Sequence, residues 1–208
     1  MYDVTLTVVD DAGLSASRTT RAYVTGAGVD ADGTLEFVGT AGGDAAYVKS
    51  KNGQVIASGA FIPGWHRVHD PANLTGLLVL TGDGNDKVDV YDTVTLNAIV
   101  DGGAGDDVLW GGGGRNLLIG CTGGDEVNGG AAADILVAGS TVLDGDPAAL
   151  RGVLLDNNPL AGLTLDDDAA DVLDGYGGAD TFHAALEGGG VLDEVLYLQE
   201  QYELIDVA

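Results

Sequence analysis

Residues 102–137 read GGAGDDVLW, GGGGRNLLI, GCTGGDEVN and GGAAADILV, which are four consecutive blocks of nine residues. Glycine begins every block, an Asp or Asn fills the sixth place, and an apolar residue fills the eighth. The sixth places are Asp107, Asn116, Asp125 and Asp134, and the eighth places are Leu109, Leu118, Val127 and Leu136. A strict period of this length predicts a repeat architecture in which every block adds the same structural unit.

Copies of the pattern also lie on both sides of this array, so the array is interrupted after residue 137 rather than finished there. A degenerate copy occupies 39–44, and better copies lie at 82–88, 166–174 and 175–183; Asp86, Asp171 and Asp180 stand in the place that aligns with the sixth.

Each block is expected to turn over its first six residues and to form a strand over its last three, with the eighth residue in the core. Two blocks make one coil, so turns about eighteen residues apart should stack. Asp107 is then expected to pair with Asp125, and Asn116 with Asp134. Carboxylates stacked about 5 Å apart would repel one another strongly unless cations neutralise them. The alternative is a glycine-rich roll without metal.

The blocks resemble the RTX, or haemolysin-type, calcium-binding repeat family. The resemblance implies an all-β fold: a right-handed parallel β-roll or β-helix of nonapeptide repeats, preceded by an antiparallel β region and interrupted by one short helix. It also implies several Ca²⁺ ions between successive turns, because calcium binds carboxylate and carbonyl oxygens. The metal-site residues that it implies are Asp86, Gly102, Gly103, Gly105, Asp107, Gly111, Gly112, Gly114, Asn116, Gly120, Asp125, Gly129, Asp134, Asp171 and Asp180.

The two sides of the array are not expected to bind calcium equally. Glycines in the first, second and fourth places allow backbone angles that other residues resist, so that carbonyl oxygens turn inward. Asn116 keeps a ligand oxygen but lacks the charge of an aspartate, and Arg115 brings a cation nearby. We therefore expect the side with Asp107 and Asp125 to bind more tightly.

The composition excludes several classes of function. The chain has 33 acidic and 8 basic residues, a formal net charge of −25 and 45% hydrophobic residues. The apolar residues suffice for a core, but phosphate recognition needs clustered Lys and Arg, so nucleic acid and anionic lipid surfaces are excluded as partners. No apolar run approaches the roughly 18 residues of a membrane span. The single cysteine, Cys121, permits no intrachain disulfide.

The array is expected to be one of three parts. Residues 1–25 predict a β-hairpin that looks like the last two strands of a PKD-type, immunoglobulin-like domain. This hairpin would pack on the next module, belong to a truncated domain, or add strands to a neighbouring molecule. Residues 26–80 predict a β-meander that leads into the roll, and 81–208 the calcium-binding roll. A helix at about 146–156 and a C-terminal cap at 191–208, either a strand pair or a helix, complete it.

A few other residues are candidates for chemistry. His66 and His69 resemble half of a zinc site, but with no third ligand they are better explained as surface residues. Cys121 stands where glycine is preferred, and a buried, unreactive thiol is the simpler reading. Trp65 and Trp110 are able to stack on sugars, although core or rim packing is the safer interpretation.

We therefore expect a calcium-stabilised, non-catalytic structural module of a secreted or cell-surface bacterial protein. One alternative is a self-assembling filament or lattice subunit, and another is an accessory or catalytic module of a polysaccharide-modifying enzyme. Against the enzyme, an acidic sugar needs Lys or Arg, and the eight basic residues look scattered along the sequence. The expected partners are calcium, further copies of the chain, and a surface polysaccharide or the cell envelope.

Overall fold

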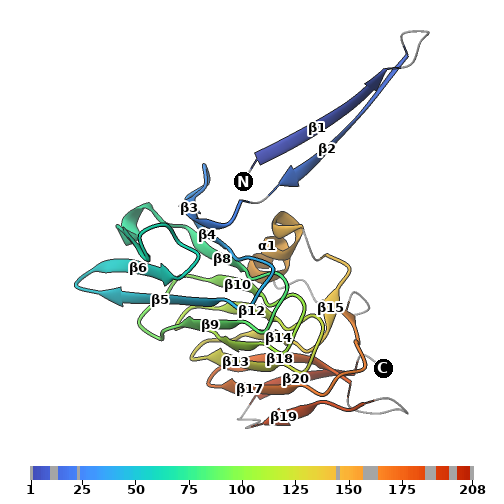
Figure 1. Ribbon diagram of the computed structural model, residues 1–208. Helices are drawn as coiled ribbons and strands as arrows, with labels where there is room; N and C mark the ends of the chain where they lie inside the picture. Colours follow the sequence, from blue (N-terminus) through green and yellow to red (C-terminus); the bar gives the residue numbers. More distant parts are fainter. Residues whose placement is uncertain are drawn as a thin grey trace.

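The computed structural model describes residues 2–9, 14–22, 24–143, 146–156, 164–185, 191–196 and 201–206. Figure 1 shows that strands dominate the chain; within these residues the only α-helix is α1 (Pro147–Asp156), and a short 3-10 turn lies at Pro71–Asn73. The all-β class predicted from the sequence is confirmed. None of the helical segments in this described part has the length and apolar character needed to cross a membrane.

Most strands of the described residues belong to two eight-stranded mixed sheets. Sheet 1 consists, in order, of β20 (Gln201–Asp206), β18 (Ala179–Ala184), β14 (Ile135–Val137), β12 (Asn116–Ile119), β10 (Ala98–Asp101), β8 (Gly76–Leu80), β4 (Thr34–Val38) and β3 (Gly26–Val29). Sheet 2 consists of β19 (Glu194–Leu196), β17 (Val172–Tyr176), β13 (Glu126–Gly130), β11 (Val108–Trp110), β9 (Lys87–Val90), β5 (Ala45–Lys51), β6 (Gln54–Gly59) and β7 (His66–His69). From β8 onward, apart from the small β15–β16 pair, successive strands alternate between the sheets and pair in parallel within each sheet.

The register follows from the nine-residue period. Leu109 pairs with Val127 and Leu118 with Leu136, so that residues eighteen apart lie side by side, as predicted. The coils are not all equal in length. Stacked aspartates of successive coils are 21 residues apart from Asp86 to Asp107, 18 apart from Asp107 to Asp125, and 46 apart from Asp125 to Asp171.

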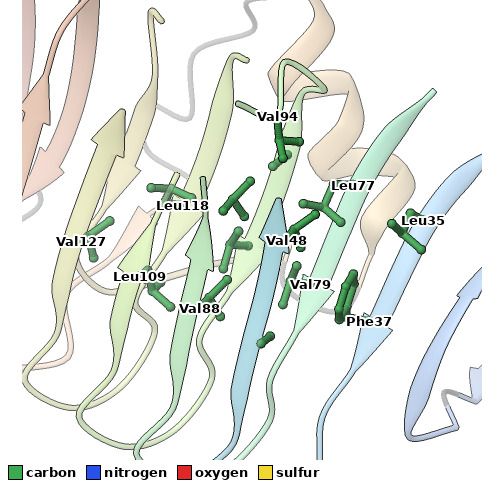
Figure 2. Packing of buried hydrophobic residues seen from close by; sticks show 14 of the residues in the cluster. Leu35, Phe37, Val48, Leu77, Val79, Val88, Val94, Leu109, Leu118 and Val127 are labelled. Atoms are coloured by element: carbon green, nitrogen blue, oxygen red, sulfur yellow. The ribbon is translucent and has the colours of Figure 1, made fainter. Parts of the chain in front are cut away.

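The core lies between the two sheets and is built from the eighth residue of each block. Leu109, Leu118, Val127 and Leu136 are all fully buried, as predicted. Figure 2 shows several of these side chains clustered between the strands of the two sheets. The same cluster extends from Leu35 to Ala184 and therefore passes across residue 81, where we expected the roll to begin.

The strands predicted between residues 26 and 80 form, but their pairing differs from the expected meander. Strands β5, β6 and β7 form an antiparallel meander, and β3 and β4 form a separate antiparallel pair. Strand β4 instead pairs in parallel with β8, and β5 pairs in parallel with β9. The degenerate copy at 39–44 explains the difference, because its turn passes the chain from sheet 1 to sheet 2 as the later repeat turns do. Alternating apolar residues alone do not distinguish parallel from antiparallel neighbours.

Helix α1 begins where the sequence predicts and interrupts the array. The carboxylate of Asp146 accepts hydrogen bonds of 3.2 Å from the backbone N–H groups of Ala148 and Ala149, and Pro147 is the first helical residue. Both features are typical of a helix N-terminus. Strands β15 (Ser140–Thr141) and β16 (Thr164–Leu165) pair on either side of the insertion.

The helix covers the outer face of sheet 1. Leu117 and Ile135 lie on that face and form a second apolar cluster with Leu150, Val153 and Leu154 of α1. Strand β12 is consequently buried along its whole length, on both faces. A strand covered on both faces has consecutive apolar residues, which explains the sequence NLLI.

The two ends of the chain also form strands. Strands β1 (Tyr2–Val9) and β2 (Ser15–Ala22) pair as the predicted hairpin, which stands away from the two sheets in Figure 1. The PKD-like character of this hairpin stays a prediction. At the other end, β19 and β20 extend sheet 2 and sheet 1 by parallel pairing with β17 and β18. Of the forms predicted for the C-terminal cap, the described residues 191–196 and 201–206 contain strands rather than a helix, one strand in each sheet.

Candidate metal centre

The sixth residues of the repeats form two columns, one at the start of each sheet's strands. In the column beside sheet 2, an aspartate precedes each strand that pairs in parallel, namely β5, β9, β11, β13, β17 and β19. The parallel register places these aspartates one above another. This column contains Asp44, Asp86, Asp107, Asp125, Asp171 and Asp193. The sequence predicts four of these aspartates as ligands, and it places Asp107 opposite Asp125.

One oxygen of each carboxylate in this column is held by the backbone of the preceding coil. The N–H of Asp86 donates to Oδ1 of Asp107 over 2.7 Å, that of Asp107 to Oδ1 of Asp125 over 2.8 Å, and that of Asp125 to Oδ1 of Asp171 over 2.6 Å. Since backbone N–H groups donate only to acceptors, this ladder fixes the orientation of each side chain. It leaves the second oxygen, Oδ2, pointing into the turn.

Several of these second oxygens are buried and lack hydrogen-bond partners among the described residues. The affected atoms are Oδ2 of Asp86, Asp107, Asp125 and Asp171 in this column and Oδ2 of Asp134 in the column beside sheet 1. All five residues are almost completely inaccessible to solvent. A buried polar atom without a partner costs about 1–3 kcal/mol, and more when the group is charged. Five repetitions of the same unsatisfied atom at one repeat position therefore indicate a missing positive partner rather than a local defect.

Backbone carbonyls surround these oxygens. A Cβ built on Gly102 would contact Oδ2 of Asp107 and would lie 2.9 Å from the carbonyl oxygen of Gly120. A Cβ built on Gly129 would lie 2.8 Å from Oδ2 of Asp134 and 2.9 Å from the carbonyl oxygen of Gly175. The first glycine of each turn thus leaves space into which a carboxylate oxygen and a carbonyl oxygen of the next coil converge.

Asn116 reveals what such a turn accommodates. Its amide nitrogen, Nδ2, donates to the carbonyl oxygens of Gly114 at 2.8 Å, Gly129 at 3.1 Å and Gly112 at 3.3 Å, and to Oδ1 of Asp134 at 3.0 Å. All four neighbours are acceptors, so the nitrogen rather than the oxygen of the amide must face them. The turn is therefore a cage of oxygens around one positively polarised atom.

In the aspartate turns an acceptor occupies the equivalent place. A Cβ built on Gly111, the first glycine of its turn, would contact Nδ2 of Asn116, just as a Cβ built on Gly120 would contact Oδ2 of Asp125. Replacing a nitrogen donor by a carboxylate oxygen in such a cage brings acceptors together without a hydrogen between them. Such an arrangement is stable only if a proton or a metal cation supplies the positive charge.

The electrostatics of the columns point the same way. Burial, reinforced by Asp171 and Asp107, raises the pKa of Asp125 to about 8. Burial likewise raises the pKa of Asp107 and Asp171 to about 7. Hydrogen bonds from the backbone oppose these shifts but do not cancel them. Without a cation, the carboxylates of Asp107, Asp125 and Asp171 tend to hold protons near neutral pH.

The second column, beside sheet 1, is mixed. Asn116 pairs with Asp134, whose Oδ1 accepts the N–H of Asn116 over 2.7 Å, and the N–H of Asp134 donates to Oδ1 of Asp180 over 2.9 Å. The register continues to Ala98 at one end and to Tyr202 at the other, neither of which has a carboxylate. Fewer carboxylates line this column, in line with the predicted order of the two sides.

The glycines of the motif serve two purposes rather than the single one that we expected. Gly103 and Gly105 have φ values of 90° and 125°, which favour glycine. Gly112 and Gly114 lack a positive φ, and there the restriction is space. A Cβ on Gly112 would lie 2.8 Å from the Val90 side chain, and a Cβ on Gly114 would contact backbone carbonyl oxygens of the preceding coil.

Sequence reasoning missed two members of the sheet 2 column. The N–H of Asp44 donates to Oδ1 of Asp86 over 2.5 Å, and the N–H of Asp171 donates to Oδ1 of Asp193 over 3.1 Å. Asp44 ends the degenerate copy at 39–44, which was recognised without being counted as a site. Asp193 precedes the apolar Val195 by two residues, the same spacing as between the sixth and eighth places.

The other candidate residues have ordinary environments, with one exception. His69 is partly buried, and burial together with Arg67 lowers the pKa of its imidazole. Cys121 is buried, and its Sγ lies 3.2 Å from Oδ1 of Asp101. Trp110 packs against the ring of Tyr176. Trp65 is the exception, because 72% of it is exposed, and core packing therefore does not explain it.

The ladder differs from a site made of side chains alone. Among the described residues, no group of three or more His, Cys, Asp or Glu side chains is placed to hold a metal ion. The columns instead present one free carboxylate oxygen in each of five turns, and the remaining acceptors are carbonyls of the backbone. No family model matches the chain, and neither the curated proteins nor the solved structures contain a match.

Proposed function

We propose that the turns bind calcium ions and that the chain is a right-handed parallel β-roll of the RTX kind, a structural module that folds when calcium binds. The observation that carries this proposal is the oxygen cage. At Asn116 an amide nitrogen fills it, whereas at Asp107 and Asp125 a buried carboxylate oxygen without a partner takes the same place.

The donor set suits calcium better than other biological cations. The cage offers carboxylate and carbonyl oxygens only, whereas zinc favours His and Cys ligands. Magnesium needs near-ideal octahedral geometry and usually keeps several water molecules, which a buried turn excludes. Calcium accepts about six to eight oxygens in flexible arrangements. Successive aspartates of the sheet 2 column would hold it together with carbonyls such as that of Gly120.

Calcium would act by linking binding to folding. The ion occupies the cage and removes the repulsion between the buried carboxylates. The cage does not exist in the unfolded chain, so calcium binds the folded chain preferentially. The free energy of binding is therefore added to the free energy of folding. Such a module is disordered at the low calcium concentration of a cytosol and folded outside the cell. This suits a non-catalytic structural part of a secreted or surface protein.

Circular dichroism of the full chain tests this proposal. We expect the β signal at neutral pH to be lost in excess EGTA and to return when calcium, but not an equal concentration of magnesium, is added. Magnesium is the control for a general effect of divalent charge on a polyanion. A spectrum that is the same in EGTA and in calcium would contradict the proposal.

A further inference from the structure

The outer face of sheet 2 contains a groove that the repeat turns do not use. In β5, Ala46 and Val48 point into the core, so Tyr47, Lys49 and Lys51 point outward. Together with Trp65 and His66 they line a groove of about 580 Å³. This groove lies over β5 and β6, on the opposite side of the sheet from the core.

The charge of this groove is the reverse of that of the chain. The sequence contains three lysines, and two of them, Lys49 and Lys51, line the groove. The third, Lys87, is the register partner of Ala45, another lining residue. Among the described residues that line the groove none is acidic, although the chain has 33 acidic residues. The lysines that look scattered in the sequence are therefore gathered at one place.

Aromatic rings accompany the lysines. Trp65 is 72% exposed and has a φ of 70°, a backbone conformation that costs free energy for a bulky residue. Tyr47 is the register partner of Ser58, which in turn pairs with His66. Large exposed aromatic residues at a groove indicate a binding surface, because burial in the core would otherwise be favoured.

The aromatic residues continue across the sheet. Tyr47 pairs with Asp89 of β9, and Asp89 pairs with Trp110 of β11, so these residues lie in one row that spans about 10 Å. The ring of Trp110 lies 5.4 Å from that of Tyr176. A smaller groove of about 260 Å³ lies beside this pair, and its lining includes Asp89, Asp92, Trp110 and Tyr176. Because two of these residues are acidic, an anionic ligand is confined to the lysine-lined groove over β5 and β6.

We propose that the lysine-lined groove over β5 and β6 binds an acidic polysaccharide. The apolar faces of sugar rings would stack on Trp65 and Tyr47, since aromatic rings provide flat apolar surfaces with polar edges. Carboxylate or sulfate groups of the glycan would bind Lys49 and Lys51, whose positions along the strand are about 7 Å apart. Complementary charge supplies the specificity, because the rest of this acidic chain repels a polyanion.

Titration of the calcium-loaded chain with short oligouronates, which do not gel with calcium, tests this proposal. A sulfated oligosaccharide and a neutral dextran fragment are titrated in the same way for comparison. The fluorescence of the tryptophans and the heat of binding are measured. We expect one or both acidic sugars to bind, which decides between carboxylate and sulfate, and the neutral sugar to bind weakly or not at all.

The variants isolate the groove. The double substitution Lys49→Gln and Lys51→Gln is expected to weaken binding by about tenfold or more, and Trp65→Ala to reduce both binding and the fluorescence change. Arg151→Gln is the control, because Arg151 belongs to α1 on sheet 1. Failure of every acidic sugar to bind, equal binding of the neutral sugar, or equal loss in the Arg151 variant would overturn the proposal.

This inference is separable from calcium binding, although it needs a folded sheet 2. Circular dichroism is recorded on the same samples in calcium and in EGTA. If the chain binds the glycan and its circular dichroism spectrum is the same in calcium and in EGTA, the proposed function alone is contradicted. A calcium-dependent spectrum without glycan binding would contradict the inference alone.

Discussion

At the scale of single residues, Asn116 explains the turn that the aspartates share. Its amide nitrogen satisfies the carbonyls of Gly112, Gly114 and Gly129, which no carboxylate oxygen can do without a cation. The sequence predicts that Asn116 weakens the calcium site on its side. The structure adds the reason, because the amide takes the place that the ion would occupy.

Replacing Asn116 by Asp should therefore make one more turn dependent on calcium. At neutral pH and a calcium concentration just sufficient to keep the wild type folded, Asn116→Asp is expected to lower the free energy of unfolding by about 1–3 kcal/mol, because it removes a donor from the cage. In saturating calcium the loss should largely disappear. Urea unfolding in the two conditions measures both values.

The matched control for this substitution is Asn52→Asp. Asn52 is exposed in the turn between β5 and β6, so the same negative charge is added away from any cage. Surface changes of this kind usually alter stability by less than about 0.5 kcal/mol. Equal stability of the two variants at the lower calcium concentration would contradict the need for a donor or a cation in the cage.

The sequence predicts the burial of sixth-place aspartates but not the unequal use of their two oxygens. That inequality arises from the ladder of hydrogen bonds between coils, such as the one from the N–H of Asp107 to Asp125. The partner lies 18 residues away in one coil and 46 in the next. A pattern within one block cannot contain this information.

At the scale of elements, α1 completes the hydrophobic burial of sheet 1. The sequence predicts the helix from Asp146 and Pro147, because these residues act locally. It does not predict which surface the helix covers, since the insertion breaks the period that relates the blocks to one another. The pairing of β4 with β8 was missed for a similar reason, because the turn at 39–44 departs from the motif.

Shortening single side chains of α1 should measure how much its packing on sheet 1 contributes to the free energy of unfolding. Leu150 is fully buried against sheet 1, whereas Leu155 on the same helix is 60% exposed. In saturating calcium, Leu150→Ala is expected to lower the free energy of unfolding by about 2–5 kcal/mol. Leu155→Ala should cost less than about 0.5 kcal/mol. Similar values for the two variants would contradict the placement of α1.

At the scale of the whole molecule, a net charge of −25 has to coexist with columns of buried carboxylates. In the sheet 2 column, burial and, to a smaller extent, repulsion by neighbouring aspartates raise the pKa of Asp107 and Asp125. Protons and calcium ions are then alternative ways of neutralising the same oxygens. Stability should therefore depend on pH in opposite ways with and without calcium.

In EGTA, folding stability should fall as the pH rises. The folded chain holds protons on Asp107, Asp125 and Asp134, whose pKa values lie at about 7, 8 and 8 against 3.8 for the ordinary side chain. A raised pKa in the folded state makes a contribution that is fully present below about pH 4 and is lost as the pH rises through about 7 to 8. Thermal unfolding between these pH values measures the trend.

With calcium, affinity should instead increase over the same pH range, because each bound ion displaces protons. Calorimetric titrations in buffers of different ionisation enthalpy report the protons released. Stability in EGTA that rises from acid to neutral pH, or calcium binding that releases no protons, would contradict this linkage.

The most direct test of calcium binding by the aspartate columns is a count of bound calcium in the wild type and in Asp125→Asn. An amide at position 125 should fill its cage as Asn116 does, so the variant should bind fewer ions and yet retain more β structure in EGTA. Asp32→Asn, which removes the same charge from an exposed residue outside the repeats, should leave both unchanged. Elemental analysis after dialysis gives the number of bound calcium ions. We predict several ions in the wild type and fewer in Asp125→Asn. No bound calcium, or the same number of ions in all three proteins, would contradict calcium binding by the aspartate columns.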